Sequence, residues 1–163
     1  ATPKSMLRHK MAVSPVSEFT HGRWQPAMGD PTITDAAAVE RIVLCSGKIR
    51  WELVAARAEA GLDQKVAILP LERLYPLPAR ELATELARYP QVTDIRYVQD
   101  EPENQGAWWF VQINLPPAIA TFLPGYELTL KGITRPAASA PSVGSVKAHA
   151  AQEAELLGRA LAG

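Results

Sequence analysis

The sequence has little cysteine and no excess of charge. Its 163 residues include one cysteine, Cys45, so no disulfide can form within the chain. Cys45 ends the apolar run at residues 42–45, which predicts a buried thiol. Lys and Arg number 17, Asp and Glu also 17, and the formal net charge is zero. This balance gives no general attraction to nucleic acid or an anionic membrane, so we expect neither as a partner.

Long hydrophobic runs are also missing. No segment approaches the roughly 20 apolar residues of a membrane-spanning helix. The N-terminus lacks the apolar core of a secretory signal. With a single cysteine, these absences favour a reducing, intracellular compartment. Hydrophobic residues make up 47% of the chain and charged residues 21%, which is typical of one globular domain with a continuous core.

No catalytic or metal-binding set is evident. His9, His21 and His149 are widely spaced and are not accompanied by the cysteine or carboxylate pattern of a zinc site. Neither Ser46 nor Ser139 lies in the Gly-x-Ser-x-Gly arrangement of a serine nucleophile. We therefore expect no catalytic residue and no metal ligand in this chain.

Residues 1–38 are predicted to be an irregular arm or linker from a preceding domain. The segment has little periodicity and carries prolines at positions 3, 15, 26 and 31. It opens in mid-pattern without an initiator methionine, which indicates a piece of a larger protein. Ordered loops of this length are uncommon inside a compact domain. Its apolar residues would pack either on the domain itself or on another surface, and they are Met6, Leu7, Phe19, Trp24 and Met28.

Residues 39–163 alternate between predicted strands and helices. The strands are expected at 41–44, 66–69, 95–98 and 126–130. The helices are expected at 48–60, 78–88, 107–123 and 145–161, with the third broken or kinked by Pro116 and Pro117. Apolar residues at helical spacing are Trp51, Val54 and Ala58, then Leu82 and Leu86, and finally Leu156, Leu157 and Leu161. The order predicts an α/β fold in three layers, a mostly parallel sheet with helices on both faces.

The first candidate site is the turn Ser46-Gly47-Lys48, which joins a predicted strand to a helix. Backbone amides at the start of that helix, with the Lys48 ammonium, would cradle an anionic effector. The turn lacks the full glycine spacing of a nucleotide-binding loop. The alternative is a tight turn in which Ser46 is the N-cap of the helix.

The second candidate is the polar stretch at residues 99–109. We interpret residues 100–105 as the loop after a strand, at the sheet edge where ligands and partners usually bind. The alternative is that Asp100, Glu101 and Glu103 are solvated acids near a helix N-terminus. The third candidate, residues 135–144, consists of small residues that either allow close approach of a partner or form an exposed linker.

Four motifs occur together in an order and spacing similar to those of one family. They lie at residues 2–9 (Thr-Pro-Lys-Ser-Met-Leu-Arg-His), 45–48 (Cys-Ser-Gly-Lys), 101–108 and 135–144. Over essentially all of its length the chain resembles the C-terminal region of the thiamine-diphosphate-dependent 2-oxoglutarate dehydrogenases. It departs from the usual pattern at Lys10, where proline is common, at Trp51, where tyrosine is common, and at residues 132–134. The resemblance implies a transketolase C-terminal type of domain.

The resemblance also implies a function for the whole enzyme, with the isolated fragment inactive. The full-length enzyme would decarboxylate 2-oxoglutarate on thiamine diphosphate with magnesium, both bound mainly outside this fragment. It would transfer the succinyl group to a lipoyl arm of the dihydrolipoyl succinyltransferase component in the tricarboxylic acid cycle. The implied partners are a second copy in a homodimer, the preceding domains, and a nucleotide or acyl-coenzyme A effector at Ser46, Gly47 and Lys48.

Within that frame, the second candidate receives provisional roles. Glu101, Asn104 and Gln105 would form a hydrogen-bonding rim at an interface or active site, and Arg135 would belong to the same rim. Trp108 and Trp109 would divide between burial in the core and burial at an interface.

Two other interpretations remain open. One is a free-standing binding or assembly module of transketolase C-terminal fold, with no thiamine enzyme attached. The other is a different member of the transketolase superfamily. We expect a cytoplasmic location if the source is bacterial and the mitochondrial matrix if it is eukaryotic.

Overall fold

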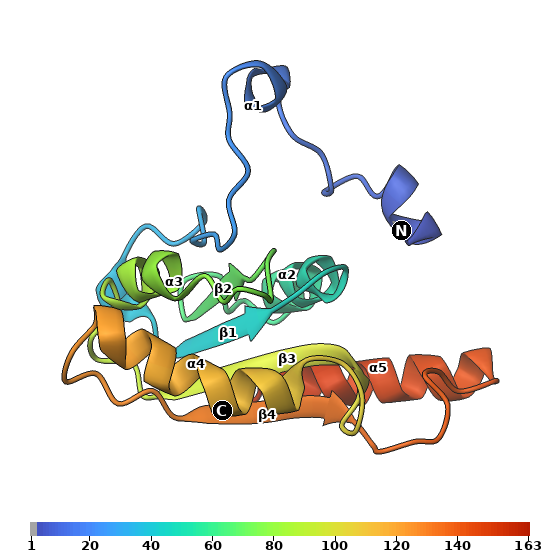
Figure 1. Ribbon diagram of the computed structural model, residues 1–163. Helices are drawn as coiled ribbons and strands as arrows, with labels where there is room; N and C mark the ends of the chain where they lie inside the picture. Colours follow the sequence, from blue (N-terminus) through green and yellow to red (C-terminus); the bar gives the residue numbers. More distant parts are fainter. Residues whose placement is uncertain (1–2) are drawn as a thin grey trace.

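A four-stranded, fully parallel sheet forms the centre of the molecule. The computed structural model describes residues 3–163 (Figure 1). The strand order is β2-β1-β3-β4, and the strands are β1 (Arg41–Cys45), β2 (Val66–Pro70), β3 (Asp94–Pro102) and β4 (Leu130–Arg135). β1 and β2 are five-residue apolar segments buried along their whole length, as expected of central parallel strands. The predicted α/β fold is confirmed.

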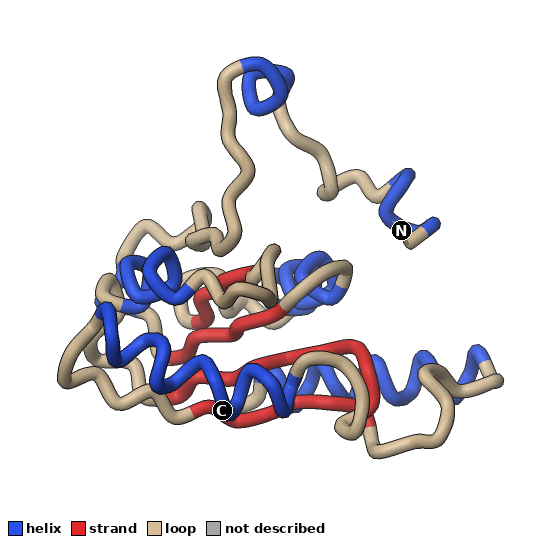
Figure 2. Tube along the Cα trace, viewed as in Figure 1, coloured by secondary structure: helices blue, strands red, loops and turns tan. Residues whose placement is uncertain are grey.

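Helices cover both faces of the sheet, as Figure 2 shows by colour. They are α2 (Ile49–Glu59), α3 (Ala79–Leu86), α4 (Trp108–Phe122) and α5 (Val146–Leu161). Successive side chains of β1 point to opposite faces, so Ile42 and Leu44 join the core under α3 and α4. Val43 and Cys45 join the core under α2 and α5. The predicted three layers are confirmed, and the Cys45 thiol is buried.

α3 buries the expected stripe of Leu82 and Leu86 in full. In α5, Leu156 and Leu161 are buried, and Leu157 is partly buried against the same core. In α2 the prediction was wrong, because the buried side chains are Ile49, Leu53 and Arg57, whereas Trp51, Val54 and Ala58 are not buried. The stripe is offset because Arg57 is drawn inward by an ion pair with Asp30, a contact that hydrophobic periodicity does not reveal.

The last strand and the third helix also differ from expectation. The strand predicted at 126–130 begins only at Leu130 and continues through Gly132 to Arg135. The third helix was expected to be broken or kinked at Pro116 and Pro117; α4 is not broken, since it continues through both prolines, and a kink there stays a prediction. Two polar side chains form hydrogen bonds to backbone carbonyl groups of this helix. Asn114 donates to Phe110 O (2.8 Å), and Thr121 donates to Pro117 O (3.2 Å).

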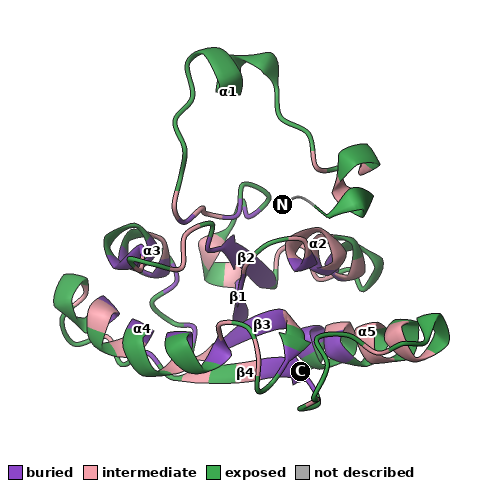
Figure 3. Cartoon of the chain, turned by 45° about the vertical axis from the view of Figure 1, so that its right-hand side comes forward, coloured by how far each residue is buried: buried purple, intermediate pink, exposed green. Residues whose placement is uncertain are grey.

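The N-terminal arm rises away from the domain and returns to it (Figure 1). It contains a short 3-10 helix at Lys4–Arg8 and the one-turn helix α1 (Val16–Thr20), and neither contains a buried residue. Figure 3 shows most of the arm as exposed. The chain rejoins the domain at Ala27, which forms an antiparallel bridge with Leu71 after β2.

Residues that follow Ala27 belong to the packed body although they fall within the predicted arm. Asp30 is 5% exposed, and its Oδ2 accepts hydrogen bonds from Arg57 Nη1 and from the Ile68 amide. Thr32 Oγ1 accepts a further hydrogen bond from Arg57 Nη2 at 2.9 Å. Ile33 is also buried. The division of the chain at residue 38 stays a prediction, whereas residues from Ala27 onward already include members of the buried core.

Candidate functional site

The loops after β1 and β3 diverge at the carboxyl edge of the sheet. β1 leads into α2 on one face, and the neighbouring β3 leads into α4 on the other. In open parallel sheets this topological switch point forms the crevice in which ligands usually bind. A cavity of about 340 Å³ lies there, and its lining residues are Ser46, Gly47, Leu74, Tyr97, Gln99, Glu101, Gly106 and Ala107. Two of the three predicted loops therefore meet at one site.

Gln99 organises the loop between β3 and α4. Its side chain is buried, and Nε2 donates to the carbonyl oxygens of Pro102 (3.0 Å) and Gln105 (2.8 Å). Its Oε1 accepts from the amides of Ala107 (3.1 Å) and Trp108 (2.8 Å). Gln99 thereby caps the N-terminus of α4, although it lies eight and nine positions before the two residues whose amides it binds. Sequence reasoning missed this role, although a polar residue at the inward-facing position after Ile95 and Tyr97 was an available signal.

Gly106 permits the Gln99 contact. Its φ is +69°, a conformation that side chains disfavour, and a Cβ placed there would lie 2.8 Å from Gln99 Oε1. A residue with a side chain at this position would displace the cap.

The rim residues Asn104 and Gln105 hold a second loop. Asn104 Nδ2 and Gln105 Nε2 each donate to Ala138 O at 3.0 Å, and the Ala138 amide donates to Asn104 Oδ1 at 3.0 Å. The second and third predicted loops therefore touch. The role of Asn104 and Gln105 at an interface or active-site rim stays a prediction.

Arg135 belongs to a charge network on the opposite side of β3 from the cavity. Its Nη2 lies 2.6 Å from Asp100 Oδ1, and Lys48 Nζ lies 3.0 Å from Asp100 Oδ2. Lys48 is also paired with Glu52 in α2. Burial alone would raise the pKa of Asp100, but hydrogen bonds from Arg135 and Lys48 outweigh this effect and hold it below its usual value. Asp100 therefore stays ionised and joins α2 to β4.

The Ser46-Gly47-Lys48 turn matches neither of the two interpretations in full. The alternative, a tight turn with Ser46 as the N-cap of α2, is wrong, because Lys48 takes that position and no side chain caps the helix. The Lys48 ammonium is shared between Asp100 and Glu52 and is not free to bind an anion. Ser46 and Gly47 do line the cavity. An anionic effector at this turn stays a prediction.

The two tryptophans of α4 have different environments. Trp108 is 6% exposed, and its ring stacks on Tyr97 at a centroid distance of 6.2 Å. Gly132 in β4 leaves room for it, since a Cβ there would lie 2.4 Å from Trp108 Cε2. Trp109 is 49% exposed. Burial of Trp109 at an interface stays a prediction.

Trp109 belongs to an apolar surface of α4. The helix contains no charged residue in its 15 positions. Besides Trp109, its exposed large side chains are Phe110, Ile113 and Phe122, and we call these four residues the α4 face. Several exposed large apolar side chains on one helix are characteristic of a contact with other protein.

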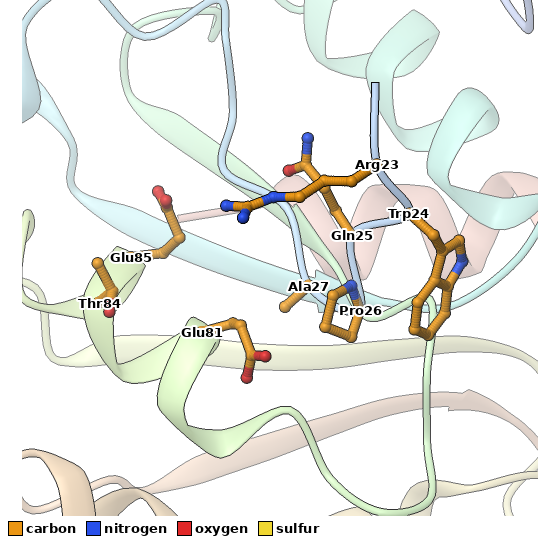
Figure 4. A pocket seen from close by; sticks show the side chains of 8 residues that line it. All are labelled: Arg23, Trp24, Gln25, Pro26, Ala27, Glu81, Thr84 and Glu85. Carbon is orange, nitrogen blue, oxygen red and sulfur yellow. The ribbon is translucent and has the colours of Figure 1, made fainter. Parts of the chain in front are cut away.

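A second hollow, of about 460 Å³, lies between the end of the arm and α3. In Figure 4 the Arg23 side chain extends toward Glu85, while Trp24 points to the other side. Within residues 3–163, no group of three or more His, Cys, Asp or Glu side chains is placed to hold a metal ion. No helix in this part of the chain is long and apolar enough to cross a membrane.

The parallel sheet, the two helical layers and the crevice at the switch point define an α/β domain of the transketolase C-terminal type. The chain belongs to the 2-oxoglutarate dehydrogenase C-terminal family, whose match covers residues 13–161. The resemblance inferred from the four motifs is confirmed.

Curated relatives cover nearly the whole chain. It is 46% identical over 165 aligned positions to the multifunctional 2-oxoglutarate metabolism enzyme of Mycobacterium sp. (strain JLS), with 99% of this chain and 13% of the relative covered. It is 41% identical over 161 positions to the 2-oxoglutarate dehydrogenase E1 component of Cupriavidus necator, with 99% of this chain and 16% of the relative covered. The chain thus spans about one seventh of the length of these relatives.

Proposed function

We propose that this chain is the C-terminal domain of a 2-oxoglutarate dehydrogenase, the decarboxylating first component of the 2-oxoglutarate dehydrogenase complex. The observation that carries the proposal is the 41% sequence identity, over almost the whole chain, to a protein named for that component. The complete enzyme decarboxylates 2-oxoglutarate on thiamine diphosphate with magnesium. It passes the succinyl group to the lipoyl arm of the dihydrolipoyl succinyltransferase component.

The domain's part in this activity is structural. In this proposal, thiamine diphosphate and magnesium are bound mainly by the rest of the enzyme, as the family resemblance implies. The α4 face and the arm supply apolar surface to contacts with the preceding domains and with the second copy of a homodimer. In the arm, Phe19 is 81% exposed and Trp24 is 63% exposed, as is typical of side chains that contact another protein surface.

A nucleotide or acyl-coenzyme A effector is a finer proposal at the Ser46-Gly47-Lys48 turn. The uncapped N-terminus of α2 supports it, since helix N-termini attract anions. A cytoplasmic location is proposed because the relatives compared are bacterial.

The test is an assay of the complete polypeptide that contains this chain. We expect release of carbon dioxide from 2-oxoglutarate when thiamine diphosphate and magnesium are present, and an intact mass many times 17.7 kDa in the native source. A matched polypeptide that ends before this chain should lose its native assembly. A native protein of 17.7 kDa without activity would instead establish the alternative, a free-standing binding or assembly module.

A further inference from the structure

α2 and α5 lie on the same face of the sheet and share one apolar core. Beside this core, Glu52 of α2 is partly buried, and its Oε1 accepts a hydrogen bond from Lys48 Nζ at 2.5 Å. The second carboxylate oxygen of Glu52, Oε2, is shielded from solvent and has no hydrogen-bond partner within residues 3–163. An ionised oxygen is costly in such a position, because burial without a partner disfavours the charged form.

Glu153 of α5 adds a second negative charge near Glu52. Burial raises the pKa of Glu52, and the charges of Glu153 and Asp100 raise it further. The hydrogen bond and the charge of Lys48 act in the opposite direction, but the pKa of Glu52 stays above its usual value. Glu52 therefore binds a proton at a higher pH than an exposed glutamate does.

The charged groups at this junction come from four elements. They are Lys48 and Glu52 in α2, Asp100 in β3, Arg135 in β4, and His149 and Glu153 in α5. Three carboxylates thus meet two permanent cations, and both cations are bound to Asp100. His149 Nε2 lies 3.9 Å from Glu153 Oε2 and adds a positive charge only when it is protonated. With His149 neutral, the junction carries an excess of negative charge.

We propose that Glu52 and Glu153 form a proton-sensitive joint between α2 and α5. While both carboxylates are ionised, their repulsion loosens the contact between the two helices. When Glu52 takes up one proton from solvent, this repulsion ends and the contact tightens. No other covalent bond forms or breaks. The joint goes beyond the decarboxylation proposed above and does not depend on it.

The joint also acts on the loop after β4. Arg135, the last residue of β4, donates hydrogen bonds to Asp100 Oδ1 and to the carbonyl oxygen of His149 near the start of α5. The loop at residues 136–144 is thus fastened between the charge network and α5. A looser α5 gives this loop more freedom at neutral pH than under mildly acidic conditions.

α5 should be held more firmly as the pH falls from neutral. Since the pKa of Glu52 is raised in the folded state, the closed joint binds a proton before the open one does. The gain begins as the pH falls through the folded pKa, and it is complete below the ordinary glutamate pKa of about 4.3. Asp100 stays ionised over most of this range, because its own pKa is lowered by hydrogen bonds from Arg135 and Lys48.

The experiment is hydrogen exchange of the complete enzyme at pH 7 and pH 5, measured by mass spectrometry. After correction for the intrinsic effect of pH on amide exchange, the remaining difference reports local opening of α5. We expect this opening to become about threefold rarer, or more, at pH 5, because each unit by which a pKa is raised changes the equilibrium by up to tenfold. α3, which packs on the other face of the sheet, is the internal reference and should not change.

Two variants remove the joint, and a third is the control. Glu52→Gln keeps the shape of the side chain without its charge, so it should abolish the pH dependence and protect α5 at pH 7. Glu153→Gln removes the opposing charge and should also reduce the pH dependence. It carries the test if Glu52→Gln does not assemble. Glu155→Gln changes an exposed acid two positions further along α5 and should leave exchange as it is.

His149→Gln separates Glu52 from the other group whose protonation removes the excess charge. A pH dependence that disappears in His149→Gln and persists in Glu52→Gln would overturn the proposal. So would exchange of α5 that does not change with pH in the unmodified enzyme. Equal effects of Glu52→Gln and Glu155→Gln would also contradict it, since they would show that the position of the charge is irrelevant.

Discussion

Asn104 and Ala138 lie 34 positions apart and exchange two hydrogen bonds, each 3.0 Å long. Asn104 uses both its amide nitrogen and its amide oxygen, so it acts toward the Ala138 backbone as a neighbouring strand would. The polar loop after β3 thereby fixes the loop of small residues after β4. Replacement of Asn104 should release the second loop without disturbing the core.

Asn104→Ala is the first prediction. The loss of two partly exposed hydrogen bonds should cost about 1–2 kcal/mol of local stability. In the complete enzyme, hydrogen exchange of the Ala138 amide should become roughly tenfold faster or more. Glu103→Ala is the control, because no side-chain contact of Glu103 is found in residues 3–163. Equal exchange rates in both variants would show that the two Asn104–Ala138 hydrogen bonds do not stabilise the loop.

The second prediction compares two glycines. Gly106→Ala should destabilise the enzyme by about 1–3 kcal/mol, because φ is positive and the new Cβ would approach Gln99 Oε1. Gly158→Ala lies inside α5, where a Cβ meets nothing within 4 Å, and it should stabilise the helix by about 0.5–1 kcal/mol. Thermal unfolding of the two variants should shift in opposite directions. A shift of the same sign would refute the assigned role of Gly106.

The third prediction concerns Cys45. Burial raises the pKa of the Cys45 thiol to about 12, so the group stays a thiol rather than a thiolate at pH 8. Iodoacetamide should therefore modify Cys45 in the denatured enzyme but not in the native one. Mass spectrometry of the peptide that contains Cys45 checks this outcome. Rapid native labelling would mean that β1 is accessible.

The fourth prediction concerns pH. The Asp94 carboxylate forms ion pairs with Arg41, Arg96 and Lys131. Burial alone would raise the pKa of Asp94. Hydrogen bonds from these three cations outweigh that effect and hold the pKa far below its usual value. Since the folded-state pKa is lowered, the stabilisation is complete above the unfolded pKa, near 4. It is lost as the pH falls from there toward the folded value.

Asp94→Asn should therefore cost about 1–3 kcal/mol at pH 7 and less at pH 3. The expected loss is large at neutral pH because Arg41 and Arg96 are both 8% exposed and would lose their carboxylate partner. Urea unfolding at the two pH values measures the difference. A cost independent of pH would show that the ion pairs are not its source.

The fifth prediction tests the α4 face. Ile113 is 68% exposed, and Ile113→Asp places a charge in the middle of this apolar surface. If the surface is buried in the complete enzyme, the variant should weaken assembly by at least tenfold, measured by sedimentation. Val146→Asp is the control: Val146 is 90% exposed at the start of α5, where an acidic side chain is favoured. Unchanged assembly in both variants would mean that the α4 face is free.

The fold could be predicted wherever apolar spacing alone decides the structure. β1 and β2 are short apolar runs with no competing pattern, and Leu82 and Leu86 mark α3 by their helical spacing. β4 was misplaced because Gly132 lowers strand propensity locally. Gly132 is required at this position because a side chain there would collide with the Trp108 ring, and Trp108 is distant in the sequence.

The candidate site was predictable in place but not in detail. The carboxyl edge of the sheet was identified, and Ser46, Gly47 and Glu101 do line its cavity. Lys48 was expected to offer its ammonium to an anion, but Glu52, four residues on in α2, and Asp100 in β3 both pair with it. The contact with Asp100 is long-range and has no signature in a single sequence.

The Asp30–Arg57 pair has a consequence for how the whole protein is put together. It closes the packed body at the point where the arm departs, so the core is complete without the exposed residues of the arm. If Phe19 and Trp24 contact a neighbouring domain or subunit, as proposed above, they do so from outside this core. A protease that cut the chain at these residues would then remove that contact and leave the domain folded.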